Sequence, residues 1–274
     1  MPDNESIKLY GLEFNFDPEN VLEPTQFAVA FAKSVGIVVK NRYSLLNKQQ
    51  RIIADVGAGS GVIAAILRED LDSEYTVLAT DLSMDALRTA QSNFSRNDLS
   101  VPLVQADLLE AFGDGALDVI VSNPPFYESQ SSEESSLPAL AIDGGSDGMD
   151  FYRRLIEIGS KKLRYDGMLF MRLESGFDNL RGPLKSPMLK DLVNLASEHF
   201  SGADLYFLVR RKIQASDYFD MPVNEEYRVC GMVVNQQIGT HEDESILGSN
   251  IDLGEIVLPD SGFGKLELVR IRHK

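Results

Sequence analysis

The sequence predicts an α/β fold in which a doubly wound, seven-stranded sheet is preceded by a short N-terminal element and followed by a C-terminal extension. Short apolar runs alternate with helical patterns, as at residues 52–56 and 62–68. Glycine or acidic residues come directly after several of these runs. The carboxyl ends of parallel strands meet at one edge of such a sheet, and ligands bind there. We therefore expect a ligand site across that edge.

The composition is typical of a globular protein. The chain has 274 residues, of which 43% are hydrophobic and 25% are charged, and no apolar run approaches the roughly 20 residues that cross a membrane. A single cysteine excludes an internal disulfide, and only three histidines argue against a metal site. The N-terminus shows no basic segment followed by an apolar core. We expect a cytoplasmic protein without a membrane partner.

The net charge of −16 bears on the partners of the protein. A surface this acidic repels phosphate backbones at long range, which disfavours nonspecific binding of nucleic acid. Two basic runs, residues 161–164 and 210–212, keep a local basic patch open as an alternative. Nucleic acid is therefore a disfavoured partner but not an excluded one.

Residues 1–50 are expected to form a hairpin and a helix, which could cover a substrate or a cofactor. Apolar and polar residues alternate on either side of Gly11, as in two short strands joined by a turn. Pro24 and Thr25 then open a helical pattern with one apolar face.

The first buried strand, residues 52–56, leads into a turn that contains Gly57, Gly59 and Gly61. A helical pattern follows at once. A glycine-rich turn between a strand and a helix lets a ligand approach the backbone and exposes the N–H groups at the start of the helix. These three glycines are therefore candidate cofactor-binding residues.

The next two strands are followed by carboxylates. Residues 77–81 form the second strand, and Asp81 lies about 20 residues after the glycine turn, where a carboxylate can bind both hydroxyls of a ribose. Residues 101–104 form the third strand, and Asp107 follows at the same edge. Each carboxylate could instead serve local structure, Asp81 as a helix N-cap and Asp107 as a solvated strand end.

The fourth strand, residues 117–121, is followed by Asn123-Pro124-Pro125-Phe126. Prolines fix φ and donate no backbone hydrogen bond, so the strand stops in a stiff extended turn. The Asn123 amide and nearby carbonyls are then held at the sheet edge, where they can accept both N–H groups of a planar –NH2 group. An ordinary turn at the end of a strand is the alternative interpretation.

The rest of the chain is expected to complete a main domain, residues 51–239, and to add a β extension, residues 240–274. Further helical patterns and strand-like runs follow the fourth strand. They lie at residues 149–162 and 188–199 for helices, and at 167–173, 203–209, 226–235, 254–258 and 265–271 for strands.

Taken together, these motifs resemble a known family. The ordered set of Asp55 to Gly61, Asp81, Asp107 and Asn123 to Phe126 is similar to that of class I S-adenosylmethionine-dependent methyltransferases of the amino-group type, which have a Rossmann-like sheet. Residues 139–155 resemble the segment that follows the catalytic motif in HemK/PrmC-type protein N5-glutamine methyltransferases. Those enzymes modify the glutamine of the GGQ motif of peptide-chain release factors. The resemblance covers roughly residues 20–175.

The resemblance implies S-adenosylmethionine as the cofactor and a role for each motif. The glycine turn would hold the methionine part, with Asp55 near its ammonium group, although Asp55 could instead cap the turn. Asp81 would hold the ribose hydroxyls, and Asp107 would bind the adenine amino group.

For the reaction, the resemblance implies that Asn123 and the Pro124 carbonyl accept the two N–H bonds of a target amide. This pairing aims the nitrogen lone pair at the sulfonium methyl group. Phe126 would pack against the target plane, with Pro125 and Tyr127 as further substrate-binding residues. The expected reaction is methyl transfer to a protein glutamine, with a release factor as the expected partner and no metal ion.

Two alternatives stay open. The family usually has tyrosine where this chain has Phe126, and the NPPF sequence also occurs in enzymes that methylate base amines in RNA. An exocyclic base amine of RNA or DNA is therefore a second candidate acceptor. A cofactor-binding module without catalytic activity is the third hypothesis, although an intact Asn123 argues against it.

Overall fold

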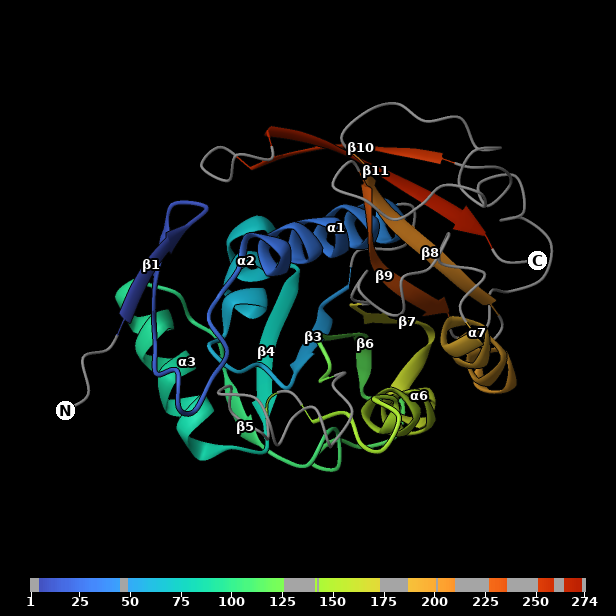
Figure 1. Cartoon of the computed structure of the whole chain (residues 1–274), viewed down its shortest axis with the longest axis horizontal. Coiled ribbons are helices and arrows are strands. Elements are labelled where there is room, and N and C mark those ends of the chain that lie inside the picture. Colours follow the sequence, from blue (N-terminus) through green and yellow to red (C-terminus); the bar gives the residue numbers. More distant parts are fainter. Residues whose placement is uncertain are drawn as a thin grey trace.

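In the residues that the structure describes, nine strands form one sheet with helices on both faces, and two more form a separate hairpin (Figure 1). The structure is a computed structural model that describes residues 5–44, 49–125, 141, 143–172, 187–200, 202–209, 227–235, 251–258 and 264–272. No helix of this part of the chain is long and apolar enough to span a membrane.

The elements have the following bounds. The strands are β1 (Glu5–Leu9), β2 (Leu12–Phe16), β3 (Arg51–Val56), β4 (Tyr75–Asp81), β5 (Leu103–Gln105), β6 (Leu117–Ser122), β7 (Leu163–Met171), β8 (Gly202–Val209), β9 (Tyr227–Asn235), β10 (Ile251–Leu258) and β11 (Gly264–Arg272). The helices are α1 (Gln26–Tyr43), α2 (Val62–Asp70), α3 (Met84–Arg96), α6 (Asp150–Lys162) and α7 (Pro187–His199).

The N-terminal segment folds as a hairpin followed by a helix, as predicted. β1 and β2 are antiparallel, and Tyr10 and Gly11 join them with φ angles of 53° and 80°, which are typical of a tight hairpin turn. α1 begins after Thr25, because the Thr25 Oγ1 accepts a 3.2 Å hydrogen bond from the N–H of Ala28 and so caps the helix.

The main sheet confirms the predicted doubly wound architecture. Its parallel part has the order β5-β4-β3-β6-β7, and β9 and β8 continue it in antiparallel pairing. These are the seven predicted strands. The C-terminal extension adds β10 and β11 to the same sheet, because β11 pairs with β8, so the described part of the chain contributes nine strands to this sheet. The division of the chain at residues 50 and 239 stays a prediction.

The central strands are buried on both faces, as is usual for parallel strands covered by helices. Successive side chains of a strand point to opposite faces. Ile53 and Val119 accordingly pack in the apolar layer that contains α1 and α2, whereas Ala54 and Ile120 pack in the layer that contains α6 and α7. Parallel pairing of these strands then brings their carboxyl ends together at one edge of the sheet.

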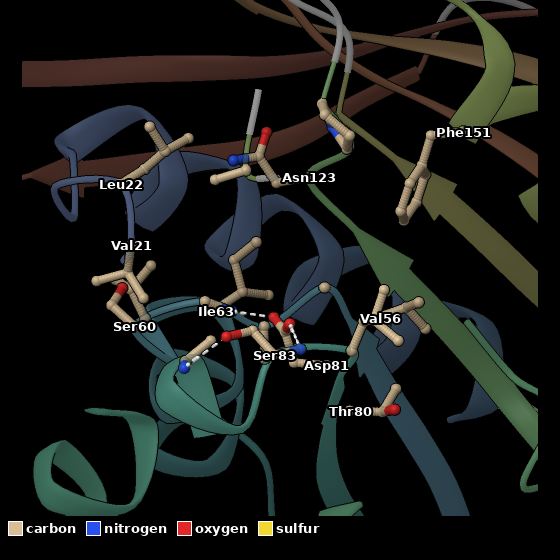
Figure 2. Close-up of a pocket in the computed structure, with 18 of the residues that line it drawn as sticks. Val21, Leu22, Val56, Ser60, Ile63, Thr80, Asp81, Ser83, Asn123 and Phe151 are labelled. Atoms are coloured by element: carbon tan, nitrogen blue, oxygen red, sulfur yellow. Dashed lines mark hydrogen bonds between the residues drawn. The ribbon is translucent and has the colours of Figure 1, made fainter. Parts of the chain in front are cut away.

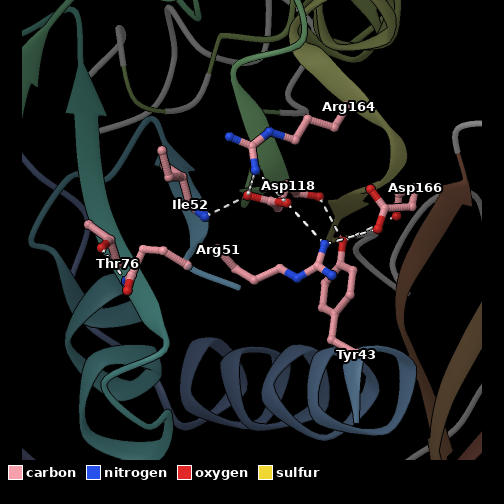
Figure 3. Close-up of polar contacts among 8 residues, drawn as sticks. Tyr43, Arg51, Ile52, Thr76, Asp118, Arg164 and Asp166 are labelled. Carbon is pink, nitrogen blue, oxygen red and sulfur yellow. Dashed lines mark hydrogen bonds and ion pairs between the residues drawn. The ribbon is translucent and has the colours of Figure 1, made fainter. Parts of the chain in front are cut away.

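A cluster of paired charged side chains lies at the amino-terminal ends of the central strands (Figure 3). Asp118 is fully buried and accepts hydrogen bonds from the guanidinium groups of Arg51 at 3.1 Å and Arg164 at 3.2 Å. Arg51 also pairs with Asp166 at 2.9 Å, and its guanidinium carbon lies 3.9 Å from the ring centre of Tyr43. The cluster joins β3, β6, β7 and α1 at the edge opposite to the glycine and acidic motifs.

Candidate active site

A cavity of about 320 Å³ opens at the carboxyl ends of β3, β4 and β6 (Figure 2). Small-molecule sites typically measure about 300–1,000 Å³. The cavity lies where the strand order reverses, because the chain runs outward from β3 to β5 and then returns to β6 on the other side of β3. Figure 2 shows Asn123 and Phe151 toward one end of the cavity, Asp81 toward the other, and Val21 along one side.

The glycine turn after β3 brings bare backbone to the cavity. Gly57, Gly59 and Gly61 have φ angles of 71°, 55° and 79°, a left-handed conformation that residues with side chains rarely adopt. Gly57 and Gly59 line the cavity, whereas Gly61 packs against α3. A Cβ atom at Gly61 would lie 2.7 Å from the Cζ atom of Phe94, so glycine is required there for close packing.

Asp55 lies behind the glycine turn and does not line the cavity. It is fully buried, its Oδ2 accepts a 3.0 Å hydrogen bond from the N–H of Ala64, and its Oδ1 has no partner within the described residues. Burial raises the pKa of Asp55 to about 7; the Ala64 N–H lowers this pKa and the charge of Asp81 raises it further. The carboxyl group therefore caps the first turn of α2, in line with the structural interpretation of this residue.

Asp81 lies in the cavity wall at the end of β4. Its Oδ2 accepts a 2.9 Å hydrogen bond from the N–H of Gly59, and its Oδ1 accepts one of 2.9 Å from the N–H of Ser83. Burial raises the pKa of Asp81, while these backbone N–H groups lower it. Ser83, rather than Asp81, is the N-cap of α3. Asp81 thus ties the glycine turn to β4 and keeps a carboxylate at the cavity.

Asp107 and Arg154 form an ion pair in the cavity wall. The Nη2 of Arg154 lies 2.8 Å from the Oδ2 of Asp107, and the two side chains are 55% and 38% exposed. An exposed pair of this kind contributes about 0–1 kcal/mol. A polar group of a ligand can therefore replace Arg154 as the partner of Asp107 at little cost.

Asn123 directly follows β6, lines the cavity and is partly buried. Its Oδ1 accepts a 3.0 Å hydrogen bond from the Nη1 of Arg172, which follows β7 and also lines the cavity. The N–H of Arg172 donates to the carbonyl of Ser122 at 2.9 Å, so the two strand ends are held in register. The bond from Arg172 fixes the orientation of the Asn123 amide. Because a carbonyl oxygen has two lone pairs, Oδ1 keeps a second acceptor position.

The diproline corner continues the wall beside Asn123. Pro124 is buried, and Pro125 is partly buried and lines the cavity. The other two residues that the sequence predicted at this corner, Phe126 and Tyr127, lie outside the described residues.

The N-terminal segment between β2 and α1 forms another wall. Residues 20–25 line the cavity, and the buried Val21 packs with Phe16 of β2 and Ala86 of α3. Part of the N-terminal element therefore lines the cavity, and its role as a cover for a substrate or cofactor stays a prediction.

Sequence motifs missed several wall residues. Phe151 and Arg154 come from α6, and Leu108 and Arg172 follow β5 and β7. Arg172 could have been found from its place at the next strand end of the parallel sheet. Phe151 and Arg154 lie in the segment 139–155 that carries the family resemblance, but the motifs predict no role for either residue, and the packing of α6 brings them to the cavity.

Residues 43–177 match the family model of the methyltransferase small domain. This range includes every strand of the parallel part of the sheet, from β3 to β7, and all the motifs at their carboxyl ends.

Curated proteins similar to the chain include release factor glutamine methyltransferases. That of Bradyrhizobium diazoefficiens is 40% identical over 136 residues, which are 47% of this chain and 45% of that protein. That of Bacillus subtilis is 38% identical over 157 residues, 54% of this chain and 53% of that protein. That of Geobacter sulfurreducens is 36% identical over 130 residues, 45% of each chain. The chain thus spans about half the length of the curated relatives it matches.

Solved structures share the fold at lower identity. The human METTL16 catalytic domain in complex with an RNA hairpin has a TM-score of 0.55 and 16% identity, over 84% of this chain and 76% of that chain. The T. thermophilus 16S rRNA N2 G1207 methyltransferase in complex with AdoMet and guanosine has a TM-score of 0.51 and 17% identity, over 85% and 50%. These likenesses bear on the fold alone. With the family match and the strand-end motifs, they lead to one conclusion: residues 43–177 of this chain match the methyltransferase small domain family and have a Rossmann-like methyltransferase fold.

Proposed function

We propose that this protein uses S-adenosylmethionine to methylate a planar amide nitrogen, namely the glutamine side chain of a protein such as a peptide-chain release factor. The observation that carries the proposal is the position of Asn123 on the same cavity as Asp81 and the glycine turn. An amide acceptor for the substrate and a nucleoside-type site for the cofactor would therefore be adjacent. A cytoplasmic location is part of the proposal.

The residues of the cavity fit this cofactor. The bare backbone of Gly57 and Gly59 suits the methionine part. A carboxylate offers about four lone-pair positions, and the backbone N–H groups around Asp81 do not use all of them, so the ribose hydroxyls could bind to the rest. Asp107 can accept the adenine amino group in place of Arg154, and the buried Val21 adds apolar wall. S-adenosylmethionine supplies a methyl group on a positively charged sulfur.

The acceptor side must orient a weak nucleophile. An amide nitrogen delocalises its lone pair, so positioning and electrostatics have to supply most of the rate. Asn123 Oδ1 and the Pro124 carbonyl would accept the two N–H bonds and stabilise the positive charge that develops on nitrogen. With S-adenosylmethionine bound, its sulfonium would supply the methyl group, S-adenosylhomocysteine would be the leaving group, and one amide proton would pass to water. Because Arg172 already holds the Asn123 amide, little reorganisation is needed.

Two observations favour a protein amide over a base amine. The curated relatives at 36–40% identity are named for glutamine methylation. The net charge of −16 opposes close approach of a phosphate backbone.

The test is incubation of the purified protein with methyl-labelled S-adenosylmethionine and either a release factor or total RNA. We expect label on the release factor, removable by protease and not by nuclease. Asn123→Ala should lower the rate by about 10²–10³-fold, the usual cost of losing one preorganised polar contact in a transition state. The variant should still bind S-adenosylhomocysteine like the unsubstituted protein, which is the control for folding.

Label on RNA alone would replace the glutamine with a base amine as the acceptor. Binding of S-adenosylhomocysteine without transfer to either fraction would instead favour the cofactor-binding module.

A further inference from the structure

Asn93 of α3 and Asn97, the residue that directly follows this helix, bind the N-terminal hairpin in the same way. Asn97 accepts the N–H of Glu13 at 2.9 Å and donates its amide N–H to the Glu13 carbonyl at 2.8 Å. Asn93 accepts the N–H of Asn15 at 2.8 Å and donates to the Asn15 carbonyl at 2.9 Å. Each side-chain amide thus pairs with one strand residue as a neighbouring strand would.

The spacing explains this match. Residues two apart on a strand are about 6.7 Å apart, because each rises about 3.3–3.4 Å. Residues four apart on a helix are separated by about 6 Å along its axis. The pair Asn93 and Asn97 therefore meets the pair Asn15 and Glu13, and α3 covers the edge of β2 that does not face β1.

Each side-chain amide makes one further bond, but within the described residues only that of Asn93 reaches the cavity, because the Nδ2 of Asn97 donates to the carbonyl of Asn93 at 2.8 Å. The Nδ2 of Asn93 also donates to the carbonyl of Ser60 at 2.9 Å, and its side chain is fully buried. Ser60 belongs to the glycine turn and lines the cavity. β2, on the other side of the amide, runs directly into residues 17–25, of which residues 20–25 form the N-terminal wall. One planar, rigid amide therefore connects the two walls, with both of its N–H groups and its oxygen in use.

We propose that Asn93 is a positioning residue that couples the N-terminal wall to the glycine turn, so that cofactor binding orders both walls together. A displacement of β2 moves Asn15, and Asn93 transmits it to the Ser60 carbonyl because its three bonds are shared by one rigid group. Asn97 lacks the bond to the turn, so it fixes the hairpin without coupling it to the cavity. The inference rests on the proposed cofactor binding.

The matched pair Asn93→Asp and Asn97→Asp tests the coupling. Each substitution keeps the shape and an acceptor oxygen but removes the two N–H donors. We expect Asn93→Asp to raise the dissociation constant for S-adenosylhomocysteine, and the KM for S-adenosylmethionine, by about tenfold or more, since buried donors and acceptors lose their partners. Asn97→Asp should change both by less than about threefold. The kcat should change less than the KM in both variants.

Hydrogen exchange provides a readout that a merely structural role would leave unchanged. In the unsubstituted protein, S-adenosylhomocysteine should slow exchange in residues 12–25 and 57–64 together. In Asn93→Asp it should slow exchange in residues 57–64 only, and in Asn97→Asp in both segments.

A second pair of variants serves if Asn93→Asp does not fold. Asn15→Pro removes the backbone N–H that Asn93 accepts, and Glu13→Pro removes the corresponding N–H for Asn97. Only Asn15→Pro should uncouple the two segments. The inference would be overturned if the two variants of either pair had equal effects on S-adenosylhomocysteine binding and hydrogen exchange. It would also be overturned if S-adenosylhomocysteine still slowed exchange in both residues 12–25 and 57–64 of Asn93→Asp. If the unsubstituted protein binds no S-adenosylhomocysteine, the proposed function itself fails, and the inference fails with it.

Discussion

Gly61→Ala is the substitution for which the structure gives the most direct energetic expectation. Gly61 ends the glycine turn and is the residue before α2, with a φ angle of 79°. A Cβ atom there would lie 2.7 Å from Cζ of Phe94 and 3.0 Å from Cβ of Ala90. Both neighbours are buried in α3, so neither can move away freely.

The expected cost has two parts. A left-handed conformation costs a residue with a side chain about 1–2 kcal/mol. Overpacking of a filled core typically adds about 1–3 kcal/mol. Gly61→Ala should therefore lower the free energy of unfolding by about 2–5 kcal/mol. Gly59→Ala is the matched control, because Gly59 has a φ angle of 55° but no atom lies within 4 Å of the added Cβ, so only the first part applies.

Urea unfolding of the two variants separates these parts. The midpoint of Gly61→Ala should fall further than that of Gly59→Ala, with similar m values. The double variant Gly61→Ala with Phe94→Leu should lose less than the two single variants added together, because the shorter side chain leaves room for the new methyl group. Equal losses for Gly61→Ala and Gly59→Ala would refute the steric argument.

Two buried carboxylates give further predictions. Folding raises the pKa of Asp55 from 3.8 to about 7, so its favourable contribution to stability is present at low pH and is lost as the pH rises through about 7. Between pH 4 and 7, ionisation of Asp55 should lower the free energy of unfolding by up to about 4 kcal/mol, and Asp55→Asn should abolish this decrease in urea titrations. If the free energy of unfolding of Asp55→Asn falls with pH as steeply as that of the unsubstituted protein, the raised pKa of Asp55 is contradicted. Asp118→Ala removes the fully buried carboxylate that Arg51 and Arg164 share, although Arg51 keeps its pair with Asp166, and should cost about 3–5 kcal/mol. Asp118 lies at the edge of the sheet opposite to the cavity, so calorimetry should give the same dissociation constant for S-adenosylhomocysteine in Asp118→Ala as in the unsubstituted protein. A larger dissociation constant in a fully folded sample would show that the buried charges at this edge affect the cavity.

The strand-end motifs could be predicted from the sequence because they depend on local patterns. An apolar run followed by glycine, carboxylate or Asn-Pro-Pro defines both a strand and its carboxyl end, and parallel pairing then brings these ends together. Asp81, Asp107 and Asn123 accordingly all line one cavity. Asp55 differs, because the same acidic residue suits a ligand contact and a helix cap; the structure shows its hydrogen bond to the N–H of Ala64 in α2, and its predicted role beside the cofactor stays a prediction.

Other features depend on contacts between distant segments. The pairing of β11 with β8 enlarges the sheet to nine strands, and no local pattern indicates which strand receives the extension. The bonds of Asn93 join residues that are 78 and 33 positions apart, and its neighbourhood in the sequence resembles any amphipathic helix. Arg172 reaches Asn123 only because β7 lies beside β6.

The identity of the methylated atom tests the central claim most directly. After incubation of a GGQ-containing release factor with S-adenosylmethionine and this protein, fragmentation mass spectrometry locates the added methyl group. An acceptor site built on Asn123 should place it on the side-chain amide nitrogen of the glutamine. A methyl group on a lysine, a terminal amine or a carboxylate, or no modification while RNA is methylated, would contradict the account.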